Sequence, residues 1–216
     1  MSATLTSAVR RLGADLDALG VRWALVGGLA VSARAEPRTT RDVDVAVSVE
    51  SDPSAERVVR GMVERGYSVT MVLEQKDAER LSTVRFSLPA EYRDLVADLL
   101  FASSGIEPEL VSAADRLRLA PGLTTPVATV AHLIALKVLA ADPARVHERP
   151  QDFADLRELF RVATDSDRST AREALALIAQ RGFHRGKDLL GSFEDLVEKY
   201  DREPEPPSLG PGRLRP

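Results

Sequence analysis

The sequence predicts an α/β (α+β) fold with a helical region appended at its C-terminal end. Residues 23–26 form a short apolar run that ends in Gly27-Gly28, a pattern typical of a strand, a tight turn and a helix start. Residues 42–47 alternate polar and aliphatic side chains at their beginning, as a half-buried strand does. From Asp152 almost to Tyr200 the apolar spacing is helical. A chain of 216 residues is long enough for one α/β core and such a region.

The remaining elements of the first half follow from apolar spacing. An amphipathic helix that ends at Gly20 is predicted because apolar residues recur at three- and four-residue steps, at Leu5, Val9, Leu12, Leu16 and Leu19. The helix that begins at Gly27-Gly28 is expected to run to Arg34. After the acidic strand, the pattern predicts a helix over 53–66, strands over 67–73 and 81–88, and a charged hairpin loop over 74–80.

The second half is predicted to be mostly helical. The expected elements are a strand over 93–101, a turn over 103–108, a helix over 127–140, and helices over 152–200 with breaks near 164–167 and 181–186. We therefore divide the chain into an α/β core over 1–128, a helical region packed on that core over 129–202, and a tail over 203–216. The tail is rich in proline and has no apolar period, so we expect it to be disordered.

Composition excludes several classes of protein. The net charge of −4 argues against a protein that coats nucleic acid through its overall charge. Without cysteine there is no disulfide, thiolate zinc site or cysteine nucleophile. Neither a P-loop motif nor a Gly-x-Ser-x-Gly elbow is present. No signal peptide and no membrane-spanning run is evident, so we expect a cytoplasmic protein with no membrane partner.

Three aspartates are the candidate metal ligands. Asp42 and Asp44 lie two residues apart on one strand, so their side chains share a face, with roughly 7 Å between their roots. Two carboxylates at that spacing can hold one Mg²⁺ or bridge two, because Mg²⁺ prefers oxygen ligands. Asp98 interrupts a second apolar run and needs a partner. Either it meets the same metal ions, or it pairs with an arginine such as Arg85 or Arg93.

The Gly27-Gly28 turn is a candidate phosphate site. Glycine lets backbone N–H groups approach an anion closely, and the start of a helix adds partial positive charge. The alternative is a tight turn that binds no ligand. The acidic strand that follows favours the phosphate interpretation.

These motifs together resemble the nucleotidyltransferase superfamily, which includes polymerase-β-like enzymes and antibiotic adenylyltransferases. Within it, the chain is most similar to the AbiEii/AbiGii-type nucleotidyltransferase toxins of bacterial toxin–antitoxin systems. Five motifs carry the resemblance: Val26-Gly27-Gly28, residues 37–44, residues 98–109, residues 132–137 and residues 149–156. The resemblance implies a nucleotidyltransferase core built on a mixed β-sheet flanked by helices. In one departure from the family, Gly28 stands where many relatives carry serine, which leaves backbone amides to bind the phosphate.

The resemblance also implies roles for site residues. It makes Asp42, Asp44 and Asp98 catalytic residues and ligands of Mg²⁺. Two Mg²⁺ ions are expected, with Mn²⁺ as the alternative metal. Lys137, also catalytic, would neutralise the β- and γ-phosphates of a nucleoside triphosphate (NTP). Without the resemblance, the sequence around Lys137 indicates a solvated lysine on an amphipathic helix.

The loop before the acidic strand and one later aspartate complete the expected site. Arg38, Thr39 and Arg41 would contact the nucleotide or the acceptor, or the arginines would pair with Glu36 on the surface. Asp152 is expected either to cap a helix or to bind Lys137 or an arginine as part of the nucleotide site.

The function implied is transfer of a nucleoside monophosphate (NMP) from NTP to an acceptor hydroxyl, with release of pyrophosphate. The resemblance implies that the acceptor is the 3′ end of a tRNA, that transfer inhibits growth by blocking aminoacylation, and that a cognate antitoxin protein exists. Two alternatives remain at this stage. The acceptor could be an antibiotic, another small molecule or a protein, because the fold does not choose the acceptor. The chain could also be a nucleotide-binding partner without catalysis.

Overall fold

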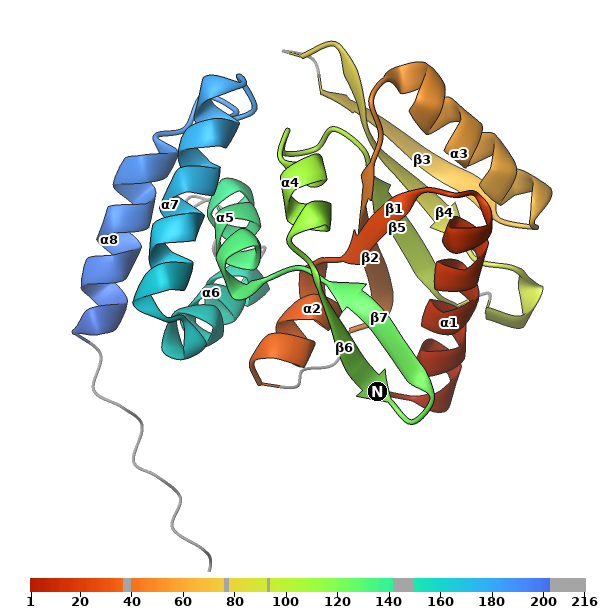
Figure 1. Ribbon diagram of the computed structural model, residues 1–216, viewed down its shortest axis with the longest axis horizontal. Coiled ribbons are helices and arrows are strands. Elements are labelled where there is room, and N and C mark those ends of the chain that lie inside the picture. Colours follow the sequence, from red (N-terminus) through yellow and green to blue (C-terminus); the bar gives the residue numbers. More distant parts are fainter. Residues whose placement is uncertain (37–39, 76–77, 93, 142–149, 203–216) are drawn as a thin grey trace, which may run out of the picture.

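The structure is organised around one seven-stranded mixed β-sheet with strand order β3-β4-β5-β2-β1-β7-β6 (Figure 1). The strands are β1 (Arg22–Leu25), β2 (Asp42–Ser48), β3 (Ser68–Gln75), β4 (Arg80–Ser87), β5 (Val96–Leu100), β6 (Asp115–Ala120) and β7 (Leu123–Val127). β2 is parallel to β5 and β1 is parallel to β7, whereas the other neighbours are antiparallel. The predicted α/β fold with a mixed sheet flanked by helices is confirmed.

This computed structural model describes residues 1–36, 40–75, 78–92, 94–141 and 150–202. Its helices are α1 (Ala3–Ala18), α2 (Gly27–Arg34), α3 (Asp52–Glu64), α4 (Glu107–Ser112), α5 (Val130–Ala140), α6 (Pro150–Val162), α7 (Asp165–Gln180) and α8 (Leu189–Asp201). Arg38, Thr39, Arg93, Arg149 and the tail over 203–216 lie outside the described residues, so the expectations for them stay predictions.

The two faces of the sheet differ in chemistry because side chains alternate along each strand. Val43, Val45 and Val47 of β2 are fully buried on one face. On the same face Phe86 of β4 meets Tyr67, whose hydroxyl donates to Asp15 of α1. Figure 1 shows α1 and α3 together on this side of the sheet. The opposite face of β2 carries Asp42 and Asp44, and the candidate site lies on this face.

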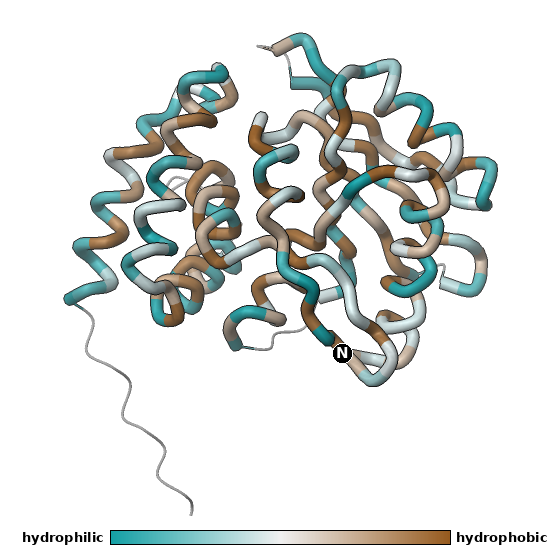
Figure 2. Tube along the Cα trace, viewed as in Figure 1, coloured by the Kyte–Doolittle hydropathy of each residue, from teal (hydrophilic) through white to brown (hydrophobic). Residues whose placement is uncertain are grey.

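The helices α5 to α8 form a group beside the sheet (Figure 1). α5 is the most buried of them, with seven buried residues: Ala131, His132, Leu133, Ile134, Ala135, Val138 and Leu139. It begins where the Thr129 side chain accepts the His132 N–H, and Lys187 donates to two carbonyl oxygens at its C-terminal end. In Figure 2 apolar residues alternate with polar ones along α7 and α8, as expected for helices with one buried side. None of the helices within the described ranges has the length and apolar character needed to span a membrane.

Several element boundaries differ from the sequence predictions. The hairpin of β6 and β7 and the short helix α4 were not expected, and the helix expected from residue 127 begins instead at Val130. Val127 ends β7, where it lies beside Leu25 of β1 and its carbonyl accepts from Arg34. The strand expected from residue 93 begins at Val96, after a 3₁₀ turn at Ala90–Tyr92. The division into a core over 1–128 and a helical region over 129–202 stays a proposal.

Candidate active site

Four charged side chains come from adjacent strands on the polar face of the sheet. In the pairing of β2 with β5, Asp44 lies directly beside Asp98. In the pairing of β5 with β4, Asp98 lies directly beside Arg85. Directly paired residues point to the same face, so Arg85, Asp98 and Asp44 form one row across three strands. Asp42 is two residues before Asp44 and belongs to the same face.

The Gly27-Gly28 turn lies against Asp44, at the end of this row opposite Arg85. Gly27 has a φ of +60°, and a Cβ added there would lie 1.9 Å from an Oδ atom of Asp44. Any other residue would therefore collide with the carboxylate, as well as adopt a backbone conformation that L-residues disfavour. The Val26 N–H donates to the Asp44 carbonyl at 2.9 Å and fixes the turn against β2. Gly28 is buried in the first turn of α2.

Asp98 is held by Arg85 through two parallel hydrogen bonds. The guanidinium Nε and Nη2 donate to the two carboxylate oxygens at 2.8 and 2.7 Å. This is the second of the two partners that the sequence analysis left open for Asp98. Within the part of the chain that the structure describes, no three His, Asp or Glu side chains are grouped closely enough to hold a metal ion.

The acids nevertheless influence one another strongly. The pKa of Asp44 is raised from 3.8 to about 6, first by burial and then by the negative charges of Asp98 and Asp42, while Lys137 and Arg85 oppose the rise. A half-buried carboxylate beside two others gains most from a nearby cation. The donor set is made of hard oxygen atoms, so Asp42 and Asp44 fit a Mg²⁺ ion.

Lys137 lies between two carboxylates of α6. Its Nζ is 2.8 Å from Asp152 and 2.7 Å from Asp155. All three side chains are largely buried, with exposed fractions of 13%, 14% and 2%. Asp152 thus contacts Lys137, which matches one of the two expectations for it, and Lys137 is not a solvated surface lysine. Asp155, which the sequence analysis did not single out, is the more buried partner.

Asp44 of the acidic face and Lys137 share one pocket of about 180 Å³, which Asp42 and Asp98 do not line. It is lined by α5, the glycine turn, β2 and the loop after β5, through residues that include Gly27, Asp44, Ser104, Leu136, Lys137 and Arg185. Arg41 does not line it. With Thr40 and Arg118, Arg41 lines a separate groove of about 760 Å³ between α1, α2 and β6. The structure therefore brings together Gly27, Asp44 and Lys137, and places Arg41 elsewhere.

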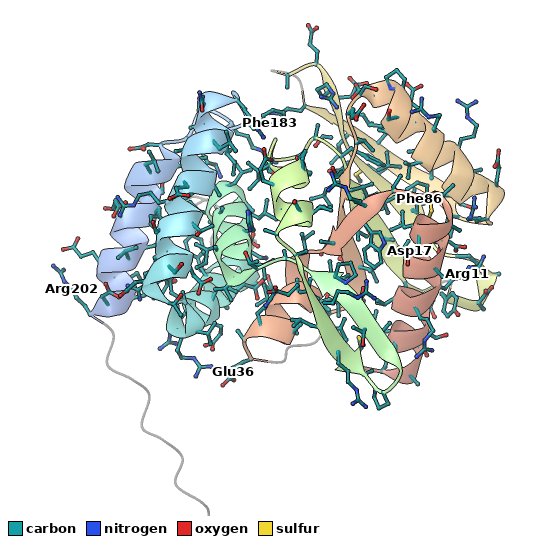
Figure 3. All side chains as sticks on the ribbon, viewed as in Figure 1. Arg11, Asp17, Glu36, Phe86, Phe183 and Arg202 are labelled. Atoms are coloured by element: carbon teal, nitrogen blue, oxygen red, sulfur yellow. The ribbon has the colours of Figure 1, made fainter. Side chains whose placement is uncertain are left out.

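Arg185 is a pocket residue that sequence reasoning missed. It lies in the loop between α7 and α8, has a φ of +55°, and donates to the Ser103 carbonyl at 3.0 Å. In the same loop Phe183 packs against Gly105, and Figure 3 shows Phe183 where this loop meets α4. Arg181 adds two hydrogen bonds to Glu109 at 3.0 and 2.7 Å. The only signal in the sequence was the predicted helix break near 181–186, because the contact joins segments about 80 residues apart in the chain.

Comparisons with known proteins show the family and the fold. A family model described as nucleotidyl transferase AbiEii toxin, type IV toxin–antitoxin system, matches residues 10–211. Among solved structures, the chain is similar to an antigenic nucleotidyltransferase-like protein from Paracoccidioides brasiliensis, with TM-score 0.52 and 17% identity over 89% of this chain and 93% of that chain. It is also similar to ANT(2″)-Ia in complex with adenylyl-2″-tobramycin, with TM-score 0.52 and 14% identity over 83% of this chain and 97% of that chain. No sequence among the curated proteins matches.

At such identities the solved structures show the fold alone. The class comes from the family model, which describes a nucleotidyl transferase. The family model covers nearly the whole chain. The chain therefore belongs to the AbiEii nucleotidyl transferase toxin family, as the resemblance predicted.

Proposed function

We propose that this chain transfers an NMP from NTP to the 3′ hydroxyl of a tRNA, in the cytoplasm, as the toxin of a toxin–antitoxin system. Nucleotidyl transfer follows from the family, and the tRNA acceptor, the growth inhibition and a cognate antitoxin are the parts proposed. The observation that carries the proposal is the shared pocket, where the glycine turn, Asp44 and Lys137 meet. An NTP needs anion donors and a cation site side by side, and this pocket offers both.

The residues in and beside the pocket have separate roles in the proposed reaction. The amides at Gly27 and Gly28 hold phosphate oxygens, and Lys137 neutralises charge that builds up on the pyrophosphate leaving group. Asp42 and Asp44 hold Mg²⁺. When bound, that ion neutralises phosphate oxygens and makes the α-phosphorus easier to attack. The acceptor oxygen forms a bond to the α-phosphorus, the bond to pyrophosphate breaks, and the acceptor proton leaves to solvent.

Asp152 and Asp155 act on the reaction through Lys137. They fix its Nζ at the pocket wall, so the lysine does not have to be ordered when NTP binds. Arg38, Thr39 and Arg41 precede the acidic strand, and we propose that they contact the acceptor or the nucleotide. Of the three, the described residues include Arg41, which lines the separate groove.

The test is the incorporation of each α-labelled NTP into deproteinised total RNA with Mg²⁺. We compare the wild type with the variant Asp42→Asn/Asp44→Asn and with Glu173→Gln, which removes an exposed carboxylate of α7. Label in tRNA-sized RNA that is lost only in the double variant supports the proposal. In parallel reactions with a cell extract in place of the RNA, label in a small molecule or in protein identifies another acceptor. A folded wild type that transfers no label to any acceptor contradicts the proposal.

A further inference from the structure

The bidentate pair between Arg85 and Asp98 bears on how many metal ions the site takes. We propose that the Arg85 guanidinium stands in for a second cation beside Asp98, so that the chain binds one divalent ion, through Asp42 and Asp44. This inference rests on the proposed function and replaces the expectation that Asp98 joins a second metal ion.

The geometry of the pair leaves Asp98 little to offer a metal. Both carboxylate oxygens accept a guanidinium hydrogen bond, at 2.8 and 2.7 Å, and the Asp98 side chain is only 14% exposed. A planar guanidinium matches a carboxylate in this fork arrangement, which is stronger than a single hydrogen bond. A metal ion that used Asp98 would have to displace at least one of these bonds.

The strand pairing, rather than chance rotamers, brings the two groups together. Arg85 and Asp98 are directly paired across β4 and β5, and Asp98 and Asp44 are directly paired across β5 and β2. The guanidinium is therefore fixed two strands away from Asp44 on the same face. It stays charged at every accessible pH, as a permanent cation must.

The local charge balance agrees with one divalent ion. Asp42, Asp44 and Asp98 bring three negative charges to this face, and Arg85 cancels one of them. The charge of Lys137 is already offset on α6 by Asp152 and Asp155, so it is not counted with the acids of the strands. Among the strand acids, Asp42 and Asp44 remain, and one divalent ion offsets their two charges.

In the reaction, Arg85 acts as a positioning residue. It keeps the charge of Asp98 neutralised beside Asp44 whether or not metal is bound, so no second ion is needed there. Transfer is then expected to depend on Mg²⁺ concentration with a Hill coefficient near one.

The direct test counts ions without using activity. Metal-free full-length protein is titrated with Mn²⁺, and free Mn²⁺ is measured by electron paramagnetic resonance. We expect one tight Mn²⁺ per chain in the wild type and two in Arg85→Met, where Asp98 is released. Arg80→Met is the matched control, because Arg80 lies on the same strand but pairs with Asp52 at 2.6 Å instead; it should keep one ion.

A second variant keeps the inference testable if Arg85→Met does not fold. Asp98→Asn should still bind one Mn²⁺, with an affinity within threefold of the wild type, because Asp98 is not a ligand. Two ions in the wild type, one ion in a folded Arg85→Met, or a tenfold loss of affinity in Asp98→Asn would each overturn the inference. If the folded wild type binds no Mn²⁺ in the presence or absence of NTP, the metal assignment of the proposed function fails instead.

Discussion

Among single residues, Gly27 is the position where the site and the backbone constrain each other most. We predict that Gly27→Ala destabilises the protein by about 1–3 kcal/mol, since alanine must adopt a positive φ, and shifts Asp44 because the new Cβ would lie 1.9 Å from its carboxylate. A displaced Asp44 should lower nucleotidyl transfer on the order of 100-fold. The measurements are urea unfolding and single-turnover transfer.

The matched control for Gly27 is Gly20. Gly20 has a φ of +69°, but nothing lies within 4 Å of an added Cβ. Gly20→Ala should therefore show the backbone strain without the loss of transfer. Equal losses of transfer in both variants would mean that the turn acts through stability alone.

Asp44 gives the metal-free protein a pH dependence whose sign follows from its raised pKa. Between about pH 4 and pH 6 the folded state binds more protons than the unfolded state, so the free energy of unfolding falls as pH rises through this window. Above pH 6 Asp44 is ionised in both states, and its ionisation in the folded state lowers the free energy of unfolding by at most about 3 kcal/mol. We predict that Asp44→Asn raises the Tm of metal-free protein at pH 7.5 and leaves it nearly unchanged at pH 4.

Magnesium should offset the destabilisation by ionised Asp44, and it should do so only in the wild type. Mg²⁺ that binds the ionised Asp44 offsets the cost, so it should raise the Tm of the wild type at pH 7.5 and not that of Asp44→Asn. Thermal unfolding with Mg²⁺ or with EDTA measures both. The same Mg²⁺ shift in the variant would show that the ion binds somewhere else.

At the scale of elements, α5 and α6 are joined by Lys137, Asp152 and Asp155. Lys137→Met should destabilise the fold on the order of 3 kcal/mol, because buried Asp155 loses its ion pair with Lys137, and should also weaken NTP binding. The double variant Lys137→Met/Asp155→Asn separates the two roles. We predict that it recovers much of the stability but none of the NTP affinity, measured by urea unfolding and by equilibrium binding of an NTP. Recovered affinity would show that Lys137 is only structural.

Sequence reasoning predicted elements well where apolar spacing was regular, and failed where tertiary contacts define the element. α2 has the predicted bounds because the glycine turn and the apolar run specify it locally. The hairpin of β6 and β7 was missed because its strands carry mostly polar or half-buried residues, and Arg34 from α2 holds its end through two carbonyls. The helix start at Val130 depends on the cap by Thr129, which apolar spacing does not report.

The same distinction holds for the site at the scale of the whole molecule. That Asp42 and Asp44 share a face could be predicted from strand periodicity alone. The choice of Arg85 as partner of Asp98 required the register of β4 against β5, and the approach of Arg185 required the packing of the loop after α7 onto the loop after β5. Residues close in sequence were predictable, whereas partners set by register or packing were not.

The contacts between the sheet and the helical group predict that the molecule unfolds as one unit. The loop after α7 binds Glu109 through Arg181 and covers Gly105 with Phe183, and α5 is buried in the core that it shares with the sheet. Trp23 is the single tryptophan and lies in β1, so its fluorescence reports the sheet, while the far-ultraviolet circular dichroism is dominated by the helices. We predict that both signals change at the same urea concentration.

Arg181→Met should lower that midpoint for both signals together. Arg172→Met, which removes an ion pair within the helical group, serves as the control for losing an arginine. If the helical signal is lost at a lower urea concentration than the Trp23 signal, the helical region over 129–202 is a separate folding unit and the contacts around Glu109 do not couple it to the sheet.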